Sequence, residues 1–406
     1  MESYFMDWLE MLFRWMHVIA GIAWIGASFY FVWLDNHLES PPRWKSDKGI
    51  KGDLWAIHGG GIYEVAKYQL APEKMPETLH WFKWEAYTTW LTGVILLILM
   101  FYLGADAYLI DPRVADLTPV QATSLGVGLI FFGWVLYECL CAIPILARNN
   151  YLLSFFLLLM VMALSYTFTH LFSGRGAFIH VGAVIGTIMA GNVFRVIIPS
   201  QKALVSAIET GKAPQASWGQ KAKLRSTHNN YFTLPLVFIM ISNHYPMTYS
   251  GENSWLVLIA IIGITAFARH YFNLRHQGIN QPLILVTSFL AAILLAWFIA
   301  PTPTSSSESA ISQQLSEVRQ INVSQVQRIL RERCASCHSR VPTDDVFIVS
   351  PAGVMLESLS DMQRWAKRIK ARSVDSHNMP FLNKTGMTSE ERLLVGRWVD
   401  AGAPSE

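Results

Sequence analysis

The sequence predicts an all-α protein in which an eight-helix polytopic membrane bundle precedes a small helical C-terminal domain. Composition is the first observation, because 52% of the 406 residues are hydrophobic and only 15% are charged, with a mean hydropathy of +0.30. Ordinary soluble domains are less apolar and carry more charge. The second observation is a series of eight apolar runs, and the third is a cysteine–histidine motif in the polar segment behind them. The net charge of +3 is small, and we expect no nucleic-acid partner.

Each apolar run is about 17–25 residues long, which is the length of a membrane-spanning helix. The sixth run is the weakest, because it contains Pro235 and ends in polar residues. In the fifth run, Gly182, Gly186 and Ala190 form a stripe of small residues that predicts close helix packing. The eight runs are 11–34, 84–104, 120–143, 151–171, 177–198, 231–249, 254–271 and 281–300.

The distribution of Lys and Arg predicts how the bundle crosses the lipid bilayer. Fifteen of these side chains fall in the connections 35–83, 144–150, 199–230 and 269–280, whereas the opposite side, apart from the C-terminal segment, carries only Arg14, Arg113 and Arg175. Positively charged connections stay on the cytoplasmic side of a membrane. We therefore expect a multi-pass protein of a bacterial inner membrane with both termini in the periplasm.

The chain changes character after residue 300, which we predict to be the end of the membrane domain, 1–300. Residues 301–320 begin with a run of Pro, Thr and Ser, which is typical of a flexible tether. Residues 321–406 predict a small domain with helices at 325–333, 361–372 and 389–401, the last with a capped start at Ser389. So small a domain buries little apolar surface, and a covalent cofactor would complete its core.

The sequence Cys334-Ala335-Ser336-Cys337-His338 is the attachment signature of a c-type haem. Both thiols become thioether links to the porphyrin, and His338 becomes an axial ligand of the iron. A zinc site is the alternative, but zinc needs two further ligands at similar spacing. The other cysteines, Cys139 and Cys141, lie in a distant apolar run.

The second axial ligand of a haem c is expected near the end of the domain. Met379 lies in Asn378-Met379-Pro380, which resembles the Met-Pro ligand turn of small class I cytochromes c. A thioether ligand raises the reduction potential, so this haem would accept electrons readily. The competing residues are Met355, Met362 and Met387 as ordinary core methionines, and His377 as a histidine ligand.

Ionisable residues inside membrane spans are functional candidates. By the predicted topology His17, His170, His180 and His244 all lie toward the periplasmic side. Two of these four would hold a b-type haem, with His17 and His180 slightly favoured as the iron ligands. The alternative is that each histidine forms a hydrogen bond between helices.

A second polar cluster is predicted on the cytoplasmic side. Its catalytic candidates are His58, His80, Arg195, His228 and His270, since histidine and arginine together bind planar hydrogen-bonding anions. The glycines after His58 would let the backbone approach a ligand closely. The alternative is ordinary positive-inside charge, which suits the lysines best. Further members are Lys83, Glu85, Asn229, Asn230, Arg269, Asn273 and Arg275.

Five further blocks of the sequence stand beside the motif that ends at His338. They are 15–26, which contains His17, then 54–61, 80–85, 228–231 and 242–246. Together with the motif, these blocks resemble the bacterial membrane-bound urate oxidase (urate hydroxylase) family of purine breakdown, which joins an eight-helix membrane domain to a C-terminal cytochrome c. The resemblance covers nearly the whole chain. The first block also resembles the opening helix of small membrane proteins that bind haem b through a histidine.

The resemblance implies an oxidoreductase whose substrate is urate. Urate would lose two electrons and gain water at carbon 5 to form 5-hydroxyisourate, and the electrons would pass through haem b and haem c to a respiratory acceptor. A histidine could take a proton from urate or water. One alternative is a quinol–cytochrome c electron relay without urate chemistry. Another is a transporter with a cytochrome sensor, although the sequence has no clear internal repeat of the kind transporters show.

Overall fold

The structure is a computed structural model that divides into two compact units. One comprises residues 1–244 and 253–295, and the other comprises 245–252 and 296–406. The predicted tether, 301–320, lies outside the described residues. These are 2–111, 114–251, 253–275, 278–300, 322–345, 347, 350–351, 354–375, 377 and 379–405.

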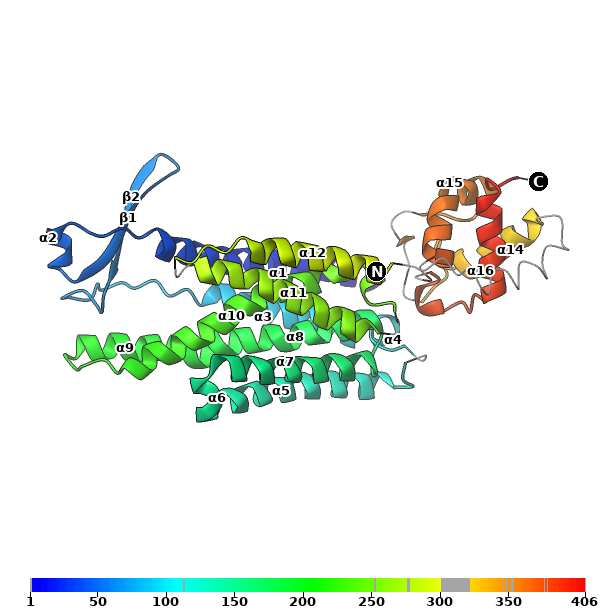
Figure 1. The fold of residues 1–406 in the computed structure, drawn as a ribbon. Coiled ribbons are helices and arrows are strands. Elements are labelled where there is room, and N and C mark those ends of the chain that lie inside the picture. The colour runs from blue at the N-terminus through cyan, green and yellow to red at the C-terminus, as the bar shows by residue number, and fades with distance from the viewer. Residues whose placement is uncertain are drawn as a thin grey trace. The chain divides into compact units, whose positions relative to one another are not determined.

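The first unit consists mainly of helices that run alongside one another (Figure 1). Its long helices are α1 (Glu2–His37), α3 (Trp84–Leu97), α5 (Pro119–Ala142), α7 (Asn150–Thr169), α8 (Gly174–Asn192), α10 (Ala216–Ser242), α11 (Ser254–Arg275) and α12 (Leu283–Phe298). Shorter elements are α2 (Arg43–Ser46), α4 (Ala105–Tyr108), α6 (Pro144–Arg148) and α9 (Ile198–Glu209), with π-helical turns at Ile98–Tyr102 and Val193–Ile197.

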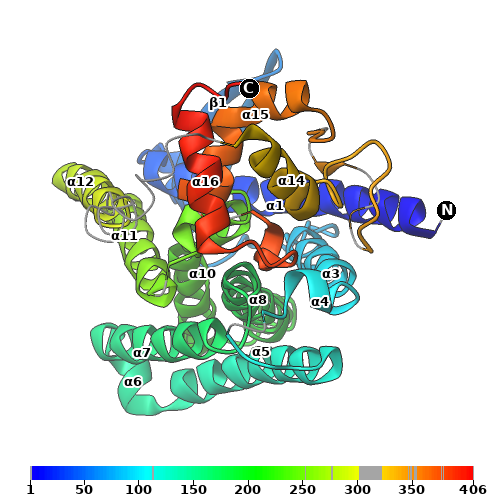
Figure 2. The ribbon, with the colours of Figure 1, turned by 90° about the vertical axis from the view of Figure 1, so that its right-hand side faces the viewer.

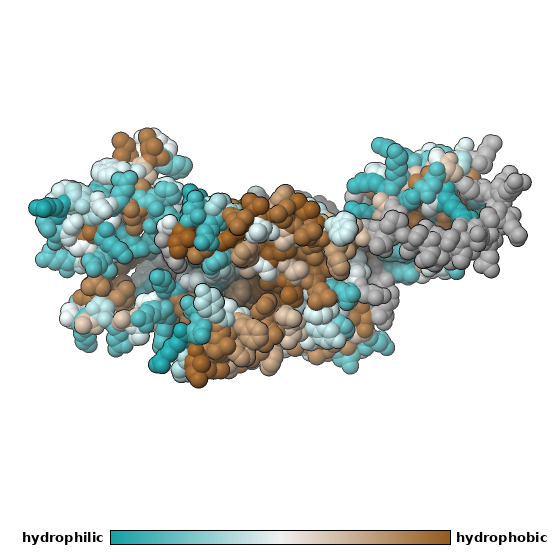
Figure 3. Space-filling view, viewed as in Figure 1, coloured by the Kyte–Doolittle hydropathy of each residue, from teal (hydrophilic) through white to brown (hydrophobic). Residues whose placement is uncertain are grey.

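Six helices in the described part of the chain are long and apolar enough to cross a membrane, which is compatible with a membrane protein. They correspond to the predicted runs 11–34, 84–104, 120–143, 151–171, 177–198 and 254–271. Apolar side chains cover the helices of this unit in Figure 3. The helix at Leu283–Phe298 is apolar but shorter. The prediction of eight spans therefore stays a prediction.

The helix predicted at 231–249 has different bounds in the structure. It begins at residue 216, in a polar segment, and ends at Ser242. A short 3-10 helix, Pro246–Thr248, follows it. Pro246 disfavours helical backbone at the residue before it, Tyr245, which explains why the helix does not continue to residue 249.

Side-chain caps define where several helices begin. Thr118 and Gln121 form a reciprocal capping box at the start of α5, with Pro119 at its first position. The side chain of Asn149 caps α7 by accepting from two backbone amides, and Ser173 caps α8. These caps satisfy amides that have no partner within their own helix.

A β-hairpin interrupts the predicted all-α fold between the first two spans. Strands β1 (Ile50–His58) and β2 (Gly61–Tyr68) pair antiparallel, with Ile57 opposite Ile62. Gly59 and Gly60 form the turn with φ angles of 57° and 81°, and a two-residue hairpin turn needs such positive angles. The glycines after His58 are therefore explained by the turn. The side chains of Ile57 and Ile62 are 76% and 74% exposed.

The hairpin is held to α2 by a buried ionic cluster. Lys45 is buried and forms ion pairs with Asp53 on β1 and Glu64 on β2. The hydrogen bond to Asp53, together with that to Glu64, raises the pKa of Lys45. The amine therefore stays charged over the physiological range of pH.

Two contacts organise the packing of the first unit. Helices α1 and α3 run antiparallel, since Arg14 contacts the sulfur of Met100 at 3.2 Å while Gly21 lies next to Thr89. Helix α8 is largely buried and packs against α3, α5, α7 and α10 (Figure 2). A Cβ atom at Gly182 would lie 2.7 Å from Cγ2 of Ile239 on α10. Part of the small-residue stripe therefore serves helix packing.

The second unit contains three helices at the predicted places. They are α14 (Val323–Cys334), α15 (Leu359–Ile369) and α16 (Ser389–Asp400), with short turns at Lys370–Asp375 and Phe381–Asn383. Their buried side chains, among them Leu330, Met362 and Trp398, form one hydrophobic core. The cap of α16 is Thr388, one residue before the predicted Ser389, and it forms a capping box with Glu391.

We predict that Gly182→Ala destabilises the first unit. The added methyl group displaces Ile239, and overpacking of this kind costs about 1–3 kcal/mol. Thermal unfolding of the detergent-solubilised protein measures the effect as a lower melting temperature. Gly128→Ala on α5 is the control, because a Cβ there has no neighbour within 4 Å. An unchanged melting temperature in Gly182→Ala would contradict tight packing of α8 on α10.

Candidate functional site

The cysteine–histidine motif forms a tight turn at the end of α14. The amides of Cys337 and His338 donate to the carbonyl of Cys334 at 3.2 and 2.9 Å. Cys334 is buried, and Cys337 and His338 are half-buried. The Nδ1–H group of His338 donates to the carbonyl of Val354 at 3.0 Å. That bond fixes the tautomer in which Nε2 carries a lone pair, as in metal-ligating histidines.

Burial shifts the pKa values of all three reactive side chains of the motif. Burial raises the pKa of the Cys334 thiol to about 12. Burial also raises the pKa of Cys337 and lowers the pKa of His338. Both sulfurs are therefore thiols and the imidazole is neutral near pH 7.

The backbone of Met379 is held from two sides. Its amide donates to the carbonyl of Arg372 at 2.9 Å, and its carbonyl accepts from Nη1 of Arg392 at 2.7 Å. Arg392 is buried, and it also donates to the carbonyl of Ser373 and to Oδ1 of Asn383. This arginine therefore fixes the segment that carries the Met379 side chain, which is half-buried.

The competing ligands have different surroundings. Met362 and Met387 are buried in the hydrophobic core, whereas Met355 and His377 are exposed. Two thiols, one neutral imidazole and one half-buried thioether form a donor set that fits a covalently attached haem. In the described part of the chain, no group of three or more His, Cys, Asp or Glu side chains is placed to hold a metal ion.

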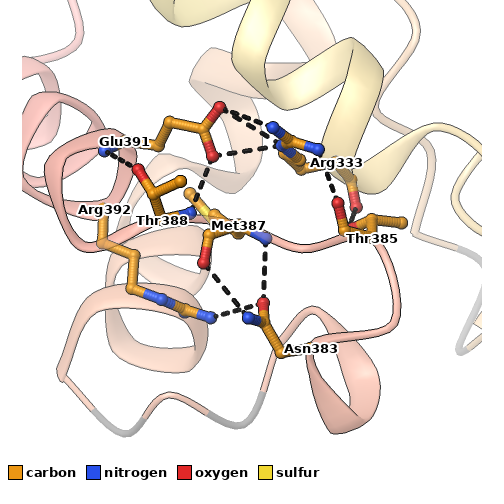
Figure 4. Close-up of polar contacts among 7 residues, drawn as sticks. All are labelled: Arg333, Asn383, Thr385, Met387, Thr388, Glu391 and Arg392. Carbon is orange, nitrogen blue, oxygen red and sulfur yellow. Dashed lines mark hydrogen bonds and ion pairs between the residues drawn. The ribbon is translucent and has the colours of Figure 1, made fainter.

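An ion pair ties α14 to the start of α16 (Figure 4). Arg333, the residue before Cys334, donates to both carboxylate oxygens of Glu391 at 2.9–3.2 Å and to the carbonyl of Thr385. Partial burial acts to raise the pKa of Glu391, but the hydrogen bonds from Arg333 and from the backbone amide of Thr388, together with the charges of Arg333 and Arg392, lower it overall. The pair therefore stays charged near pH 7 and holds the motif against the segment that precedes α16.

His180 on α8 is the most enclosed of the four histidines proposed for haem b. It is fully buried, and its Nδ1–H group donates to the carbonyl of Gly176 at 2.8 Å. Nε2 has no hydrogen-bond partner among the described residues. A Cβ atom at Gly126 on α5 would lie 2.7 Å from this nitrogen, so only glycine fits there. Four aromatic rings surround the imidazole, those of Phe101, Tyr102, Phe168 and Phe172.

His17 on α1 has a similar polar arrangement at another height of the bundle. Its Nδ1 lies 2.9 Å from the carbonyl of Thr89 and 3.0 Å from Oγ1 of Thr92. His180 instead contacts Phe101, nine residues beyond Thr92 along α3 and its π-helical extension. Nine residues correspond to roughly 13 Å of helix rise. The two imidazoles therefore contact this helix at different heights, and no hydrogen bond or ring contact between them occurs among the described residues.

The other two haem b candidates lie at the surface. His170 is exposed, and its Nδ1–H group donates to the carbonyl of Tyr166 at 2.7 Å. His244 is also exposed and follows the end of α10. Among the four, His180 alone combines complete burial with a nitrogen that lacks a partner in the described residues.

The structure separates most of the catalytic candidates. His58 is exposed at the end of β1, and His80 is exposed with its ring against Phe82. The guanidinium of Arg195 lies over the ring of Trp134 at 5.4 Å. These three residues therefore do not come together in one site.

His228 belongs to a closed hydrogen-bond network between α5, α8 and α10. Its Nδ1 lies 2.8 Å from the hydroxyl of Tyr137, which also bonds to Asn192. Arg225 pairs with Glu138 at 2.8 Å and donates to Asn192 at 3.2 Å. Every buried charge in this network has an opposite charge beside it. We therefore assign the network a structural role.

His270 lies beside a second group of polar residues, in which some buried polar atoms have no hydrogen-bond partner among the described residues. Its Nδ1 lies 2.6 Å from the hydroxyl of Tyr231. The neighbouring Arg269 is buried and donates to Oδ1 of Asn230 at 2.7 Å. Ser28 on α1 approaches the same oxygen at 3.4 Å. Arg269 and Asn230 belong to the wider polar cluster that the sequence predicts but not to its catalytic candidates, and only the fold places Arg269 in the interior.

Comparison with protein families identifies one that covers most of the chain. A family model described as "Urate oxidase N-terminal" matches residues 3–300. The match includes every helix of the first unit and ends before the cysteine–histidine motif. Comparisons with curated proteins and with solved structures gave no match.

We predict that Arg392→Lys loosens the Met379 segment. Lysine cannot reach all three acceptors, and each buried carbonyl left without a donor costs about 1–3 kcal/mol. The expected result is a lower melting temperature of the second unit in the full chain, followed by circular dichroism. Arg397→Lys, on the same helix, should leave that temperature unchanged. Equal behaviour of the two variants would mean that Arg392 does not fix the segment.

Proposed function

The chain belongs to the urate oxidase N-terminal family, which makes it an oxidoreductase acting on urate, and we propose that it oxidises urate to 5-hydroxyisourate in a bacterial inner membrane. The family match over residues 3–300 carries this proposal. Urate and one water molecule give 5-hydroxyisourate, two protons and two electrons. We further propose that the electrons leave for a respiratory acceptor, so that no hydrogen peroxide forms.

A haem c at the C-terminal motif is the proposed exit for the electrons. When bound, a c-type haem takes up and releases electrons one at a time. Cys334 and Cys337 would hold it covalently, and His338 would ligate its iron through Nε2. The hydrogen bond from His338 to Val354 supports this role, because it orients the ring and keeps Nε2 unprotonated. Arg392 would keep Met379 in place as the second ligand.

A haem b in the first unit is the proposed link between urate and haem c. His180 is the preferred ligand of this second haem. Three observations support it: the bond from Nδ1 to Gly176, the buried Nε2 without a partner among the described residues, and the glycine at position 126. His17 is the next candidate, since its Nδ1 is held by Thr89 and Thr92.

The side of the membrane follows from charge. The excess of Lys and Arg in alternate connections supports the proposal that both termini and the cytochrome c domain are periplasmic. The polar groups around Arg225 and Arg269 would then lie toward the cytoplasm. The residue that takes the proton from urate or water is proposed to be a histidine, with His270 the best placed beside the polar group of Arg269.

We predict that excess urate reduces the haem c of the purified, oxidised protein in the absence of oxygen. The absorption bands of the ferrous haem report the electron transfer directly. Cys337→Ser should lose covalent haem c and the urate-dependent electron output together. Reduction by dithionite serves as the control for intact haem in the wild type. A haem that stays oxidised with urate but is reduced by quinol would instead indicate an electron relay without urate chemistry.

We predict that a pyridine haemochrome assay finds b-type haem beside c-type haem. His180→Ala should lose the b-type band and keep the c-type band, because the variant removes a ligand in the first unit only. His37→Ala, an exposed histidine at the end of α1, is the control and should keep both. The same loss in His17→Ala but not in His180→Ala would transfer the ligand to His17. A wild type with c-type haem alone would end the haem b proposal.

A further inference from the structure

Arg269 is a buried cation to which the described residues supply no counter-ion. The side chain is 3% exposed, and within the described ranges no carboxylate lies at ion-pair distance from it. Arg225, which is also buried in the first unit, provides a contrast. Arg225 is 8% exposed and pairs with Glu138 through two nitrogens. An arginine that is buried and unpaired is costly, so its retention calls for an anion.

The atoms around Arg269 leave hydrogen-bond capacity for a ligand. Nη2 donates to Asn230, but Nε is buried and has no partner among the described residues. Asn273, one helical turn further along α11, likewise keeps Nδ2 buried without a partner there. Nε of Arg269 and Nδ2 of Asn273 are therefore two donors on one face of α11 that can bind acceptor atoms of a ligand.

An aromatic ring and a hydroxyl group of α1 complete the surroundings. The ring of Phe29 lies 4.6 Å from the guanidinium carbon, and the hydroxyl of Ser28 approaches Asn230. The group therefore combines one positive charge with amides, a hydroxyl and a flat apolar face.

We propose that this group, formed by α1, α10 and α11 around Arg269, is the urate-binding site; this assignment rests on the proposed function. Urate at neutral pH is a flat monoanion whose edges carry carbonyl oxygens and ring nitrogens. One guanidinium balances one negative charge and meets a flat edge through two parallel donors. Asn230 and Asn273 match neutral polar edges, and Phe29 offers a stacking face. A phosphate group carries more charge and usually recruits several cations, which the described residues here do not provide.

Binding can be measured apart from turnover. Protein that is fully reduced with dithionite has no electron acceptor left, so urate binds without being oxidised. Equilibrium binding of radiolabelled urate to this reduced full-length protein gives a dissociation constant. Haem c content and the melting temperature show that each variant is folded.

Arg269→Gln should weaken urate binding by about 10- to 100-fold, because a charge-assisted bidentate contact is lost. Arg148→Gln, an exposed arginine at the end of α6, is the matched control and should bind as the wild type does. Asn273→Asp is the second variant. It places a carboxylate one turn from Arg269, so it should weaken urate binding while keeping or raising the melting temperature.

The binding measurements distinguish a wrong assignment of the urate site from a wrong proposed function. If the wild type binds urate and Asn273→Asp and Arg269→Gln bind within threefold of it, the site lies elsewhere and the proposed function stands. If the wild type neither binds urate nor passes its electrons to haem, the proposed function fails, and the assignment with it. A phospholipid that copurifies with the wild type and is lost in Arg269→Gln, with urate binding unchanged, would assign the group to lipid and overturn the proposal.

Discussion

The organising constraint of this molecule is that polar groups removed from water must find partners within the protein. The first unit meets it in most places, as in the network that joins Tyr137, Asn192 and Arg225 to Glu138. Buried networks of this kind are stable only when every member is satisfied. Against that background, the described residues leave a few buried atoms without partners, among them Nε2 of His180 and Nε of Arg269. These exceptions are informative because native structures tolerate few of them.

Three histidines share one arrangement although they come from different helices and different units. His17, His180 and His338 each place Nδ1 against a backbone carbonyl at 2.8–3.0 Å. The donor to a carbonyl must carry the proton, so the opposite nitrogen keeps its lone pair. Ligation of iron therefore needs no change of tautomer at any of the three. The same arrangement also occurs at the exposed His170 and His37, so it prepares a histidine for ligation without identifying one by itself.

Much of the fold was predictable because apolar length and periodicity decide where helices form. Six of the predicted spans correspond to helices long and apolar enough to cross a membrane, and the three helices of the C-terminal unit lie close to where the sequence places them. The hairpin was missed because its strands are mostly exposed and are stabilised by the ionic cluster of Lys45 rather than by an apolar face. The haem-attachment motif at Cys334 could be recognised from the sequence because its residues are consecutive. The sequence did not show that Arg225 is paired and that Arg269, within the described residues, is not. The counter-ion of Arg225 is Glu138, which lies on another helix and comes near only in the folded chain.

The exposed end of the β-hairpin has a practical consequence. Beyond the bridge between Glu39 and Asp53, the edges of this two-stranded ribbon have no partner strand among the described residues, and its tip presents Ile57 and Ile62 with the neighbouring rings of Trp55 and Tyr63. Unpaired strand edges and exposed apolar tips are sites at which protein chains associate and aggregate. Extracted material is accordingly expected to self-associate through this ribbon when detergent is scarce, and shortening it at the Gly59–Gly60 turn offers a route to monodisperse samples.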